Sequence, residues 1–500
     1  MLKKLPFYPL LFSIFPVVSL AAYNIDQISL DVIIRPLFVS LFIGAILLGL
    51  MGLIFRDWDR AALAALLIMA LFFSYGQIYN LLEDVTLGKL SIFRHRTLLP
   101  LFGIALAILL FFVARRFTQS KGLTIGLNIL SLFLLIYPVS KITLDVFQQW
   151  SADGTVHASY REVVPKTNQP DIYYIILDSY GREDILRDLF GYDNKDFLNS
   201  LRQRGFYIAD CSQSNYAYTE FSLASSLNYD YLDRLNVSHS RADRIALLKH
   251  SATRSFLEAN GYEIVAFPTG WAFTEWKDAD LYLDVEHAVT SLTEFESLVL
   301  DTTAMRAFSD LRSSKRVDAS HKDLRRLRIF SLLDNIKKLP ERNGNFFVFA
   351  HMVVPHLPYT FGPNGEVPAF EGKNASYQET ATAYVDQVRF VNEEVLDVID
   401  ILIRNSKVPP IIILQGDHGP LPDLVVDSTE RLSILNAYYL PGIEVDRTLY
   451  PSISPVNSFR VVLNSYFGQN LPLLDDQSYF GPPDGRDEYQ RVPNTCPGNE

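Results

Sequence analysis

The chain has 500 residues, 49% of them apolar, and a formal net charge of −11. Residues 1–150 hold 12 Lys and Arg and 7 Asp and Glu, whereas the whole chain holds 45 basic and 56 acidic residues. The acidic excess therefore lies in residues 151–500. Nucleic acid requires a basic surface, so this charge distribution excludes a nucleic-acid-binding function. The length allows two or three domains.

Five apolar stretches occur before residue 142, each about as long as a bilayer core requires. They are Leu5–Ala22, Ile33–Phe55, Ala61–Tyr79, Leu98–Ala114 and Leu123–Val139. We therefore predict an N-terminal α-helical transmembrane bundle of five helices in residues 1–141. Leu5–Ala22 has an alternative interpretation as a cleaved signal peptide, with Lys3 and Lys4 as its basic start.

The charges of the connecting segments predict the orientation of this bundle. With the N-terminus in the cytosol, the segments on that side hold Lys3, Lys4, Arg56, Arg60, Arg115, Arg116 and Lys121. The segments on the opposite side hold only Arg35, Lys89, Arg94 and Arg96. The excess of cations on the cytosolic side favours this orientation. Five crossings then deliver the rest of the chain to the periplasm or the outer face.

Residues 142–170 are predicted to be a linker, because they are polar and rich in turn-forming residues. Residues 171–500 then form one extracytoplasmic domain. In it, short β-branched and apolar runs alternate with segments of helical spacing. The runs are Asp171–Leu177, Tyr262–Phe267, Asn345–Ala350, Ile411–Leu414 and Leu435–Leu440. This alternation predicts an α/β fold with a mainly parallel central sheet. Helices with solvated charged faces are expected over Leu292–Leu339.

Three of these predicted strands end in residues that can bind a metal. Asp178 follows the first strand, His351 and His356 follow Asn345–Ala350, and Asp417-His418 follows Ile411–Leu414. Ligands and catalytic groups collect at the carboxyl ends of parallel strands. A divalent cation accepts both carboxylate oxygen and imidazole nitrogen, so these groups are candidate metal ligands.

A hydroxyl-rich segment, Asn215–Ser226, lies between the first strand and the histidines. Its second half has helical spacing, and a helix N-terminus favours an alkoxide or a bound phosphate. Thr219, Ser214, Ser222 and Ser225 are the candidate nucleophiles. Most hydroxyls in such a segment only cap the helix or contact solvent.

These motifs and their order resemble those of the alkaline-phosphatase-like superfamily, which includes sulfatases and phosphodiesterases. The motifs that carry the resemblance are I-I-L-D-S, T-x-x-S, H-x-x-x-x-H-x-P and G-D-H-G. With five apolar helices in front, the chain looks most similar to the membrane-bound lipid A phosphoethanolamine transferases and lipoteichoic acid synthases. The resemblance implies an alkaline-phosphatase-like α/β domain behind the membrane bundle.

The resemblance also implies roles for single residues. Asp178, Thr219, Asp417 and His418 would bind the metal, and Thr219 would also be the nucleophile. His356 would contact the phosphoryl or leaving group. No histidine follows His418, which favours a single divalent ion, Zn or Mn, over a binuclear site.

Two further residues are predicted to bind substrate with His356, namely His351 and Arg182. The predicted reaction moves a phospholipid-derived group, of the phosphoethanolamine or phosphoglycerol type, onto an envelope glycan or lipid through a Thr-linked intermediate. The lipid donor and the glycan or lipid acceptor are the expected partners, and the bacterial inner membrane is the expected location. The alternatives are a phosphate- or sulfate-ester hydrolase and a non-catalytic envelope assembly protein that retains the fold.

The chain contains two cysteines, Cys211 and Cys496, and neither belongs to a CxxC motif. This excludes a thiolate zinc knuckle. In an oxidising compartment the two can form a disulfide that ties the C-terminal tail to the domain. Two unpaired thiols are the alternative.

Overall fold

The computed structural model describes most of the chain, in two compact units. The described residues are 5–25, 28–82, 85–87, 90–115, 121–153, 169–235, 241–285, 292–312, 317–370, 375–420, 424–425, 427–482, 489–494 and 496. Unit 1 contains Met1–Phe147 and His287–His321, and unit 2 contains Gln148–Glu286 and Lys322–Glu500. Each unit has hydrophobic clusters of its own.

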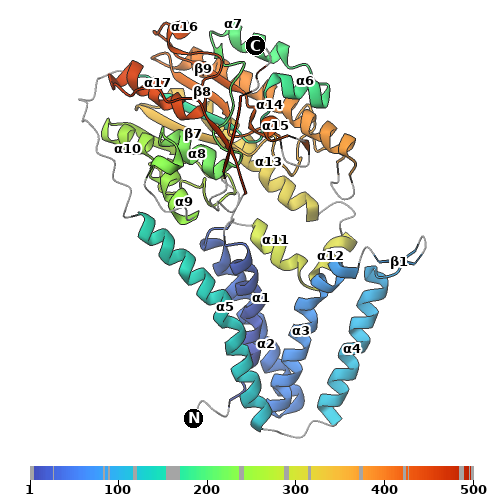
Figure 1. Ribbon diagram of the computed structural model, residues 1–500. Coiled ribbons are helices and arrows are strands. Elements are labelled where there is room, and N and C mark those ends of the chain that lie inside the picture. Colours follow the sequence, from blue (N-terminus) through green and yellow to red (C-terminus); the bar gives the residue numbers. More distant parts are fainter. Residues whose placement is uncertain are drawn as a thin grey trace. The chain divides into compact units, whose positions relative to one another are not determined.

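Unit 1 contains the predicted membrane helices (Figure 1). Its elements are α1 (Tyr8–Tyr23), α2 (Asp31–Phe55), α3 (Trp58–Leu82), β1 (Thr86–Leu87), β2 (Leu90–Ser91), α4 (His95–Arg115), α5 (Lys121–Asp153), α11 (Glu294–Asp301) and α12 (Met305–Arg312). Among the described residues, α2, α3, α4 and most of α5 are long and apolar enough to cross a membrane, and α1 is a shorter apolar helix. The chain is therefore a membrane-anchored protein, and the predicted α-helical bundle is confirmed.

The first helix is packed into this bundle. Val17 and Ala21 of α1 form a buried cluster with Ile33 of α2 and Phe295 of α11. Near its start, the backbone N–H of Tyr8 donates to Oδ1 of Asn128 in α5 at 2.9 Å. Removal of α1 as a signal peptide would uncover these apolar groups, so its packing favours the interpretation as a retained helix.

The fifth helix is longer than the sequence predicted. The sequence predicts a linker from residue 142, but α5 continues to Asp153. The reason is that no Gly or Pro occurs between Val139 and Asp153, so nothing stops the helix. The remainder of the predicted linker falls largely on residues 154–168, which lie outside the described residues.

Unit 2 is built around a seven-stranded sheet. Its strands are β3 (Ile172–Leu177), β4 (Tyr207–Ile208), β5 (Glu263–Ala266), β6 (Leu281–Tyr282), β7 (Phe346–Met352), β8 (Ile411–Gly416) and β9 (Asn436–Tyr439), with a separate hairpin of β10 (Ser478–Phe480) and β11 (Gln490–Val492). The sheet order is β4-β9-β8-β3-β7-β5-β6. β3 pairs in parallel with both β7 and β8, whereas β9 is antiparallel to β8. The prediction of a mainly parallel central sheet is confirmed.

Helices cover both faces of this sheet (Figure 1). They are α6 (Glu183–Phe190), α7 (Lys195–Gln203), α8 (Thr219–Leu227), α9 (Arg241–Lys249), α10 (Ala252–Ala259), α13 (Val317–Ile336), α14 (Tyr377–Asn405), α15 (Ser428–Leu432), α16 (Val445–Thr448) and α17 (Pro455–Phe467), with short 3-10 turns at Leu232–Arg234 and Leu339–Glu341. Alternate residues of β3 belong to two cores: Tyr173 packs with α13 and α14, and Tyr174 packs with α8 and α17. This alternation buries both faces of the central strand, as a doubly covered parallel sheet requires.

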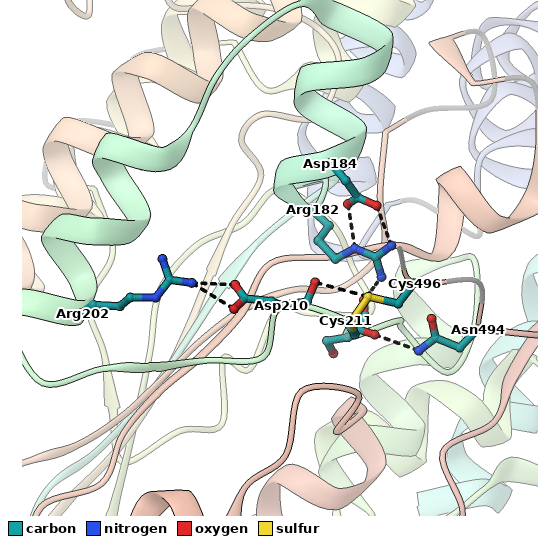
Figure 2. The surroundings of a disulfide bond; sticks show 8 residues. Arg182, Asp184, Arg202, Asp210, Cys211, Asn494 and Cys496 are labelled. Carbon is teal, nitrogen blue, oxygen red and sulfur yellow. Dashed lines mark hydrogen bonds and ion pairs between the residues drawn. A yellow bond between two sulfur atoms is a disulfide. The ribbon is translucent and has the colours of Figure 1, made fainter. Parts of the chain in front are cut away.

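The two cysteines form a disulfide (Figure 2). Their Cα atoms lie 5.3 Å apart, and the side chain of Asn494 donates to the carbonyl of Cys211 at 2.8 Å. The bond therefore ties the C-terminal tail to the segment that follows β4. The alternative of two unpaired thiols is excluded.

The prediction of solvated helices over Leu292–Leu339 is wrong for its first part. The helices α11 and α12 belong to unit 1, where Phe295 and Ala307 are buried against apolar side chains of the membrane helices. The sequence carried no signal for this packing, because charged residues are interspersed with the apolar ones.

Candidate active site

The central strands bring two carboxylates and an imidazole to one edge of the sheet. Asp178 follows β3, Asp417 follows β8, and His351 is the penultimate residue of β7, paired in register with Ile176. One ligand atom from each of the three side chains lies within 4.8 Å of the other two. Oδ2 of Asp178 is 3.4 Å from Nε2 of His351. All three side chains are buried, so the group forms a buried cluster of potential metal ligands.

The turn after β3 is held in a specific backbone conformation. Ser179 has a φ of 69°, a left-handed conformation that is uncommon for a residue with a side chain. In this conformation its backbone N–H donates to Oδ1 of Asp417 at 3.0 Å. The hydroxyl of Tyr384, in α14, donates to the carbonyl of Ser179 at 2.9 Å and accepts from the N–H of Gly181 at 3.1 Å. Tyr384 thus fixes the turn that carries Asp178.

The two glycines of the G-D-H-G motif allow close approach of the backbone. A Cβ atom on Gly416 would lie 2.6 Å from the carbonyl oxygen of Tyr180, and one on Gly419 would lie 2.6 Å from that of Glu430. Both distances are too short for a side chain. Close backbone packing therefore requires a glycine on either side of Asp417 and His418.

His418 presents one ring nitrogen to the cluster. Its Nδ1 lies 3.0 Å from the carbonyl of Gly419, which assigns the proton to Nδ1 and leaves a lone pair on Nε2. This Nε2 is 3.4 Å from Oδ2 of Asp417 and 3.7 Å from Oδ1 of Asp178. Burial and the neighbouring Arg431 guanidinium hold the pKa of His418 well below its ordinary value. The imidazole is therefore neutral and can bind a metal through Nε2.

Among the four hydroxyls considered from the sequence, Thr219 is the one that contacts this histidine. Thr219 is the first residue of α8, and its Oγ1 lies 3.2 Å from Nε2 of His418. Ser214 donates to the carbonyl of Tyr216 and Ser225 to that of Asp230. The hydroxyl of Ser222 is buried and has no hydrogen-bond partner among the described residues. The geometry thus favours Thr219 over its three neighbours.

His356 lies on the loop after β7, at the border of the cluster. Its ring centroid is 6.4 Å from that of His418, and the edge of Trp271 packs against it at 5.5 Å. Nδ1 lies 2.6 Å from the carbonyl of Leu357, so the proton resides there and Nε2 carries the lone pair. Nη1 of Arg325 donates to the same carbonyl at 2.6 Å. The orientation of the ring is thus set by the loop and by α13.

Arg431 contacts His418, although no sequence motif points to it. The first residues of α15 follow the G-D-H-G loop, and Arg431 is buried near the end of this helix. Its guanidinium donates to the carbonyls of Gly419 and Pro420 at 2.9 and 2.8 Å, and Nη2 lies 3.2 Å from Nε2 of His418. A single arginine outside any motif could not be singled out from the sequence. It holds the loop that carries His418.

Arg182 takes no part in these contacts. Its guanidinium forms two hydrogen bonds with Asp184, at 2.7 and 2.8 Å, and donates to the carbonyl of Ser212 at 3.1 Å (Figure 2). It lines a separate cavity of about 390 Å³ beside the Cys211–Cys496 disulfide. These hydrogen bonds hold Arg182 against Asp184 and Ser212, and its substrate-binding role stays a prediction.

The electrostatics of the cluster suit a divalent cation. Burial opposes ionisation of Asp178, but the neighbouring His356, His351 and His418 hold the pKa of this carboxyl well below its ordinary value. Burial and the charge of Asp178 raise the pKa of Asp417 to about 6. Among the described residues, Oδ2 of Asp417 and both ring nitrogens of His351 lack hydrogen-bond partners. Buried nitrogen and carboxylate oxygen atoms without hydrogen-bond partners are ligands that a divalent cation can bind.

No protein-family model matches the chain, and no curated protein matches it. Among solved structures, the C-terminal periplasmic domain of EptC from Escherichia coli is similar, with 12% identity and a TM-score of 0.45 over 68% of this chain and 98% of that one. The integral membrane protein lipooligosaccharide phosphoethanolamine transferase A from Neisseria meningitidis is also similar, with 12% identity and a TM-score of 0.44 over 92% and 94% of the two chains. A protein of the alkaline phosphatase superfamily from Vibrio parahaemolyticus has 11% identity and a TM-score of 0.39 over 67% and 81%.

Proposed function

We propose that the chain is a membrane-anchored, metal-dependent transferase that moves a phospholipid-derived phospho-group of the phosphoethanolamine or phosphoglycerol type onto an envelope acceptor, with Thr219 as the nucleophile. The observation that carries this proposal is the position of the Thr219 hydroxyl, 3.2 Å from Nε2 of His418 and beside the buried donors of Asp178, His351 and Asp417. A nucleophilic hydroxyl at such a cluster is what phosphoryl transfer requires.

Asp178, Asp417 and His418 would hold the cation next to Thr219, and His351 would be a further donor. A divalent ion at such a position lowers the pKa of a neighbouring hydroxyl and offsets negative charge on phosphoryl oxygens. Thr219 would have a second advantage from its place at the start of α8, where the helix dipole favours negative charge.

The reaction then needs two exchanges of O–P bonds. In the first, Thr219 Oγ1 bonds to phosphorus and the bond from phosphorus to the diacylglycerol oxygen breaks. Thr219 loses one proton and the departing alcohol gains one, so the step is balanced. His356, whose Nε2 carries a lone pair, is the proposed group for this proton transfer. In the second, an acceptor hydroxyl attacks the Thr219 phosphodiester, and the threonine hydroxyl is restored.

Release of diacylglycerol tests this function. Purified full-length protein with Zn²⁺ or Mn²⁺ would be incubated with phosphatidylethanolamine or phosphatidylglycerol in mixed micelles. We expect diacylglycerol to form with one of these lipids, and Thr219→Ala to reduce the rate at least ~10³-fold. Ser222→Ala is the matched control, because Ser222 lies one turn further along the same helix and its hydroxyl has no partner among the described residues. Turnover of a soluble aryl phosphate with no diacylglycerol from either lipid would favour the hydrolase alternative.

A further inference from the structure

The helices α11 and α12 come from the middle of the chain, yet they belong to the unit of the membrane helices. In Figure 1 they lie beside α1 and α3. Phe295 of α11 is buried with Val17 and Ala21 of α1 and Ile33 of α2. Glu296 of α11 forms an ion pair with Arg35 of α2. Apolar packing and a charge pair therefore both fix α11 to the bundle.

The connection between α11 and α12 bonds directly to the backbone of α3. The N–H of Gly76 donates to the carbonyl of Thr302 at 3.1 Å, and the N–H of Ala304 donates to the carbonyl of Phe72 at 2.9 Å. This approach requires a glycine, because a Cβ atom on Gly76 would lie 2.1 Å from the carbonyl oxygen of Asp301. The connection is thus an integral part of the bundle.

These hydrogen bonds also indicate how deep in the bilayer the connection between α11 and α12 lies. Phe72 and Gly76 lie ten and six residues before the end of α3 at Leu82, which is roughly 15 and 9 Å along the helix axis. The 25 residues of α3 span about 37 Å against about 30 Å for a bilayer core. Even if all of the α3 length that exceeds the bilayer core projects beyond it at the Leu82 end, the connection between α11 and α12 lies at or below the boundary of the hydrocarbon core.

Among the described side chains of α11 and α12, three apolar ones are exposed. Leu298, Met305 and Phe308 are 37%, 42% and 61% exposed. Between the last two, Arg306 places its guanidinium 4.7 Å from the ring centroid of Tyr79, which stacks on His95 at 3.9 Å. Apolar side chains beside an arginine and stacked aromatic rings are characteristic of the membrane interface, where the cation meets lipid phosphate.

We propose that α11 and α12 are embedded in the leaflet at the end of the bundle where α3 terminates. Leu298, Met305 and Phe308 contact acyl chains of glycerophospholipids, and Arg306 lies at the level of their phosphates. The membrane helices against which α11 and α12 pack also expose apolar side chains, and an arginine complements the lipid phosphate, so lipid is the occupant that fits. The proposal does not depend on the catalytic function.

Lipid quenching of a fluorophore tests this placement in the full-length protein. Both cysteines of the chain are joined in the disulfide, so a single introduced cysteine can be labelled specifically. A bimane label would be attached at Phe308→Cys or Met305→Cys, in proteoliposomes of phosphatidylethanolamine and phosphatidylglycerol. The quenchers would be lipids spin-labelled at a shallow or a deep acyl position, and aqueous iodide.

Two exposed positions are the controls. Phe133→Cys, on α5 and 70% exposed, reports lipid at mid-membrane depth, and Tyr377→Cys, at the start of α14 and 50% exposed, reports water. We expect the labels at 308 and 305 to be quenched at least about half as strongly as that at 133, better by shallow than by deep spin labels, and weakly by iodide. Quenching that matches position 377 would overturn the proposal. Resistance to both lipid and iodide would also overturn it, because a second copy or another protein would then cover the surface.

Discussion

Oγ1 of Thr219 lies 3.2 Å from Nε2 of His418, although the two residues are 199 positions apart in the chain. Thr219 begins α8 on one face of the sheet, and His418 follows the strand β8 that pairs with β3. A contact across this separation depends on the whole α/β fold. It is the feature of unit 2 on which the proposed role of Thr219 as the nucleophile rests.

Loss of one carboxylate should change both metal binding and stability. In Asp417→Asn we expect the metal-free protein to melt at a higher temperature than the wild type, because one of two adjacent buried carboxylates is removed. The wild type should gain about 2.7 kcal/mol of stability at a metal concentration ~100 times its Kd, and the variant should gain far less. Thermal denaturation with chelator and with Zn²⁺ or Mn²⁺ measures both effects. Asp188→Asn, at an exposed position on α6, is the control, and an equal metal-induced shift in the two variants would rule out Asp417 as a ligand.

The loss of rate on replacing His356 should increase with the basicity of the leaving group. We expect His356→Gln to slow diacylglycerol release by about 10²–10⁴-fold, because the departing alkoxide needs a proton. An ester of nitrophenol leaves without protonation, so its turnover should fall by less than about 10-fold. Steady-state rates with the two substrates give the comparison. An equal loss with both would show that His356 only supports the fold of its loop.

Tyr384 should act through the turn that it holds. Tyr384→Phe removes the hydroxyl that bonds to both Ser179 and Gly181, and we expect a loss of about 1–2 kcal/mol in unfolding free energy. Because this turn orients Asp178 and the N–H to Asp417, metal affinity should fall as well. Tyr377→Phe, on the same helix, is the control, since its hydroxyl makes one long hydrogen bond of 3.4 Å to Leu424. Unchanged metal affinity in Tyr384→Phe would contradict the positioning role.

The stability of unit 2 should depend on pH through Asp171. Its carboxylate accepts from the N–H of Phe346 at 2.9 Å, yet burial raises the pKa of Asp171 to about 6. Between pH 4 and 6 the folded chain therefore holds this proton more tightly than the unfolded chain, so stability falls as the pH rises and is level above about pH 6. Asp417, whose pKa is also raised to about 6, contributes a slope of the same sign. Asp171→Asn should therefore reduce the slope and stabilise the protein at pH 7 by on the order of 1 kcal/mol, allowing for partial exposure. Parallel slopes for the two proteins in denaturation from pH 4 to 7 would contradict this expectation.

The sequence predicted the sheet and the two carboxylates at its edge, because the necessary signals are local. β-branched runs mark β3 and β8, and Asp178 and Asp417 follow them directly. Parallel pairing then brings their carboxylates together without further information. His418 lies beside Asp417 because the two residues are adjacent in the G-D-H-G motif.

Three features could not be predicted, because each depends on contacts distant in sequence. From the sequence His351 is a candidate both for the metal and for substrate, and only the register of β7 against β3 brings it to Asp178. Arg431 reaches His418 only because α15 folds back over the loop. The helices α11 and α12 look like solvated surface in the sequence, and the burial of Phe295 and Ala307 and the close approach at Gly76 reveal that they belong to the membrane unit.

Mass spectrometry of the intact protein tests the central claim most directly. Full-length protein, metal and donor phospholipid would be mixed without acceptor, quenched in acid and measured, with Thr219→Ala as the control. We expect the wild type to gain the mass of one phosphoethanolamine or phosphoglycerol group, peptide mapping to locate it at Thr219, and the variant to gain none. An unmodified wild-type protein that nevertheless releases diacylglycerol, or an adduct that persists in Thr219→Ala, would contradict the claim.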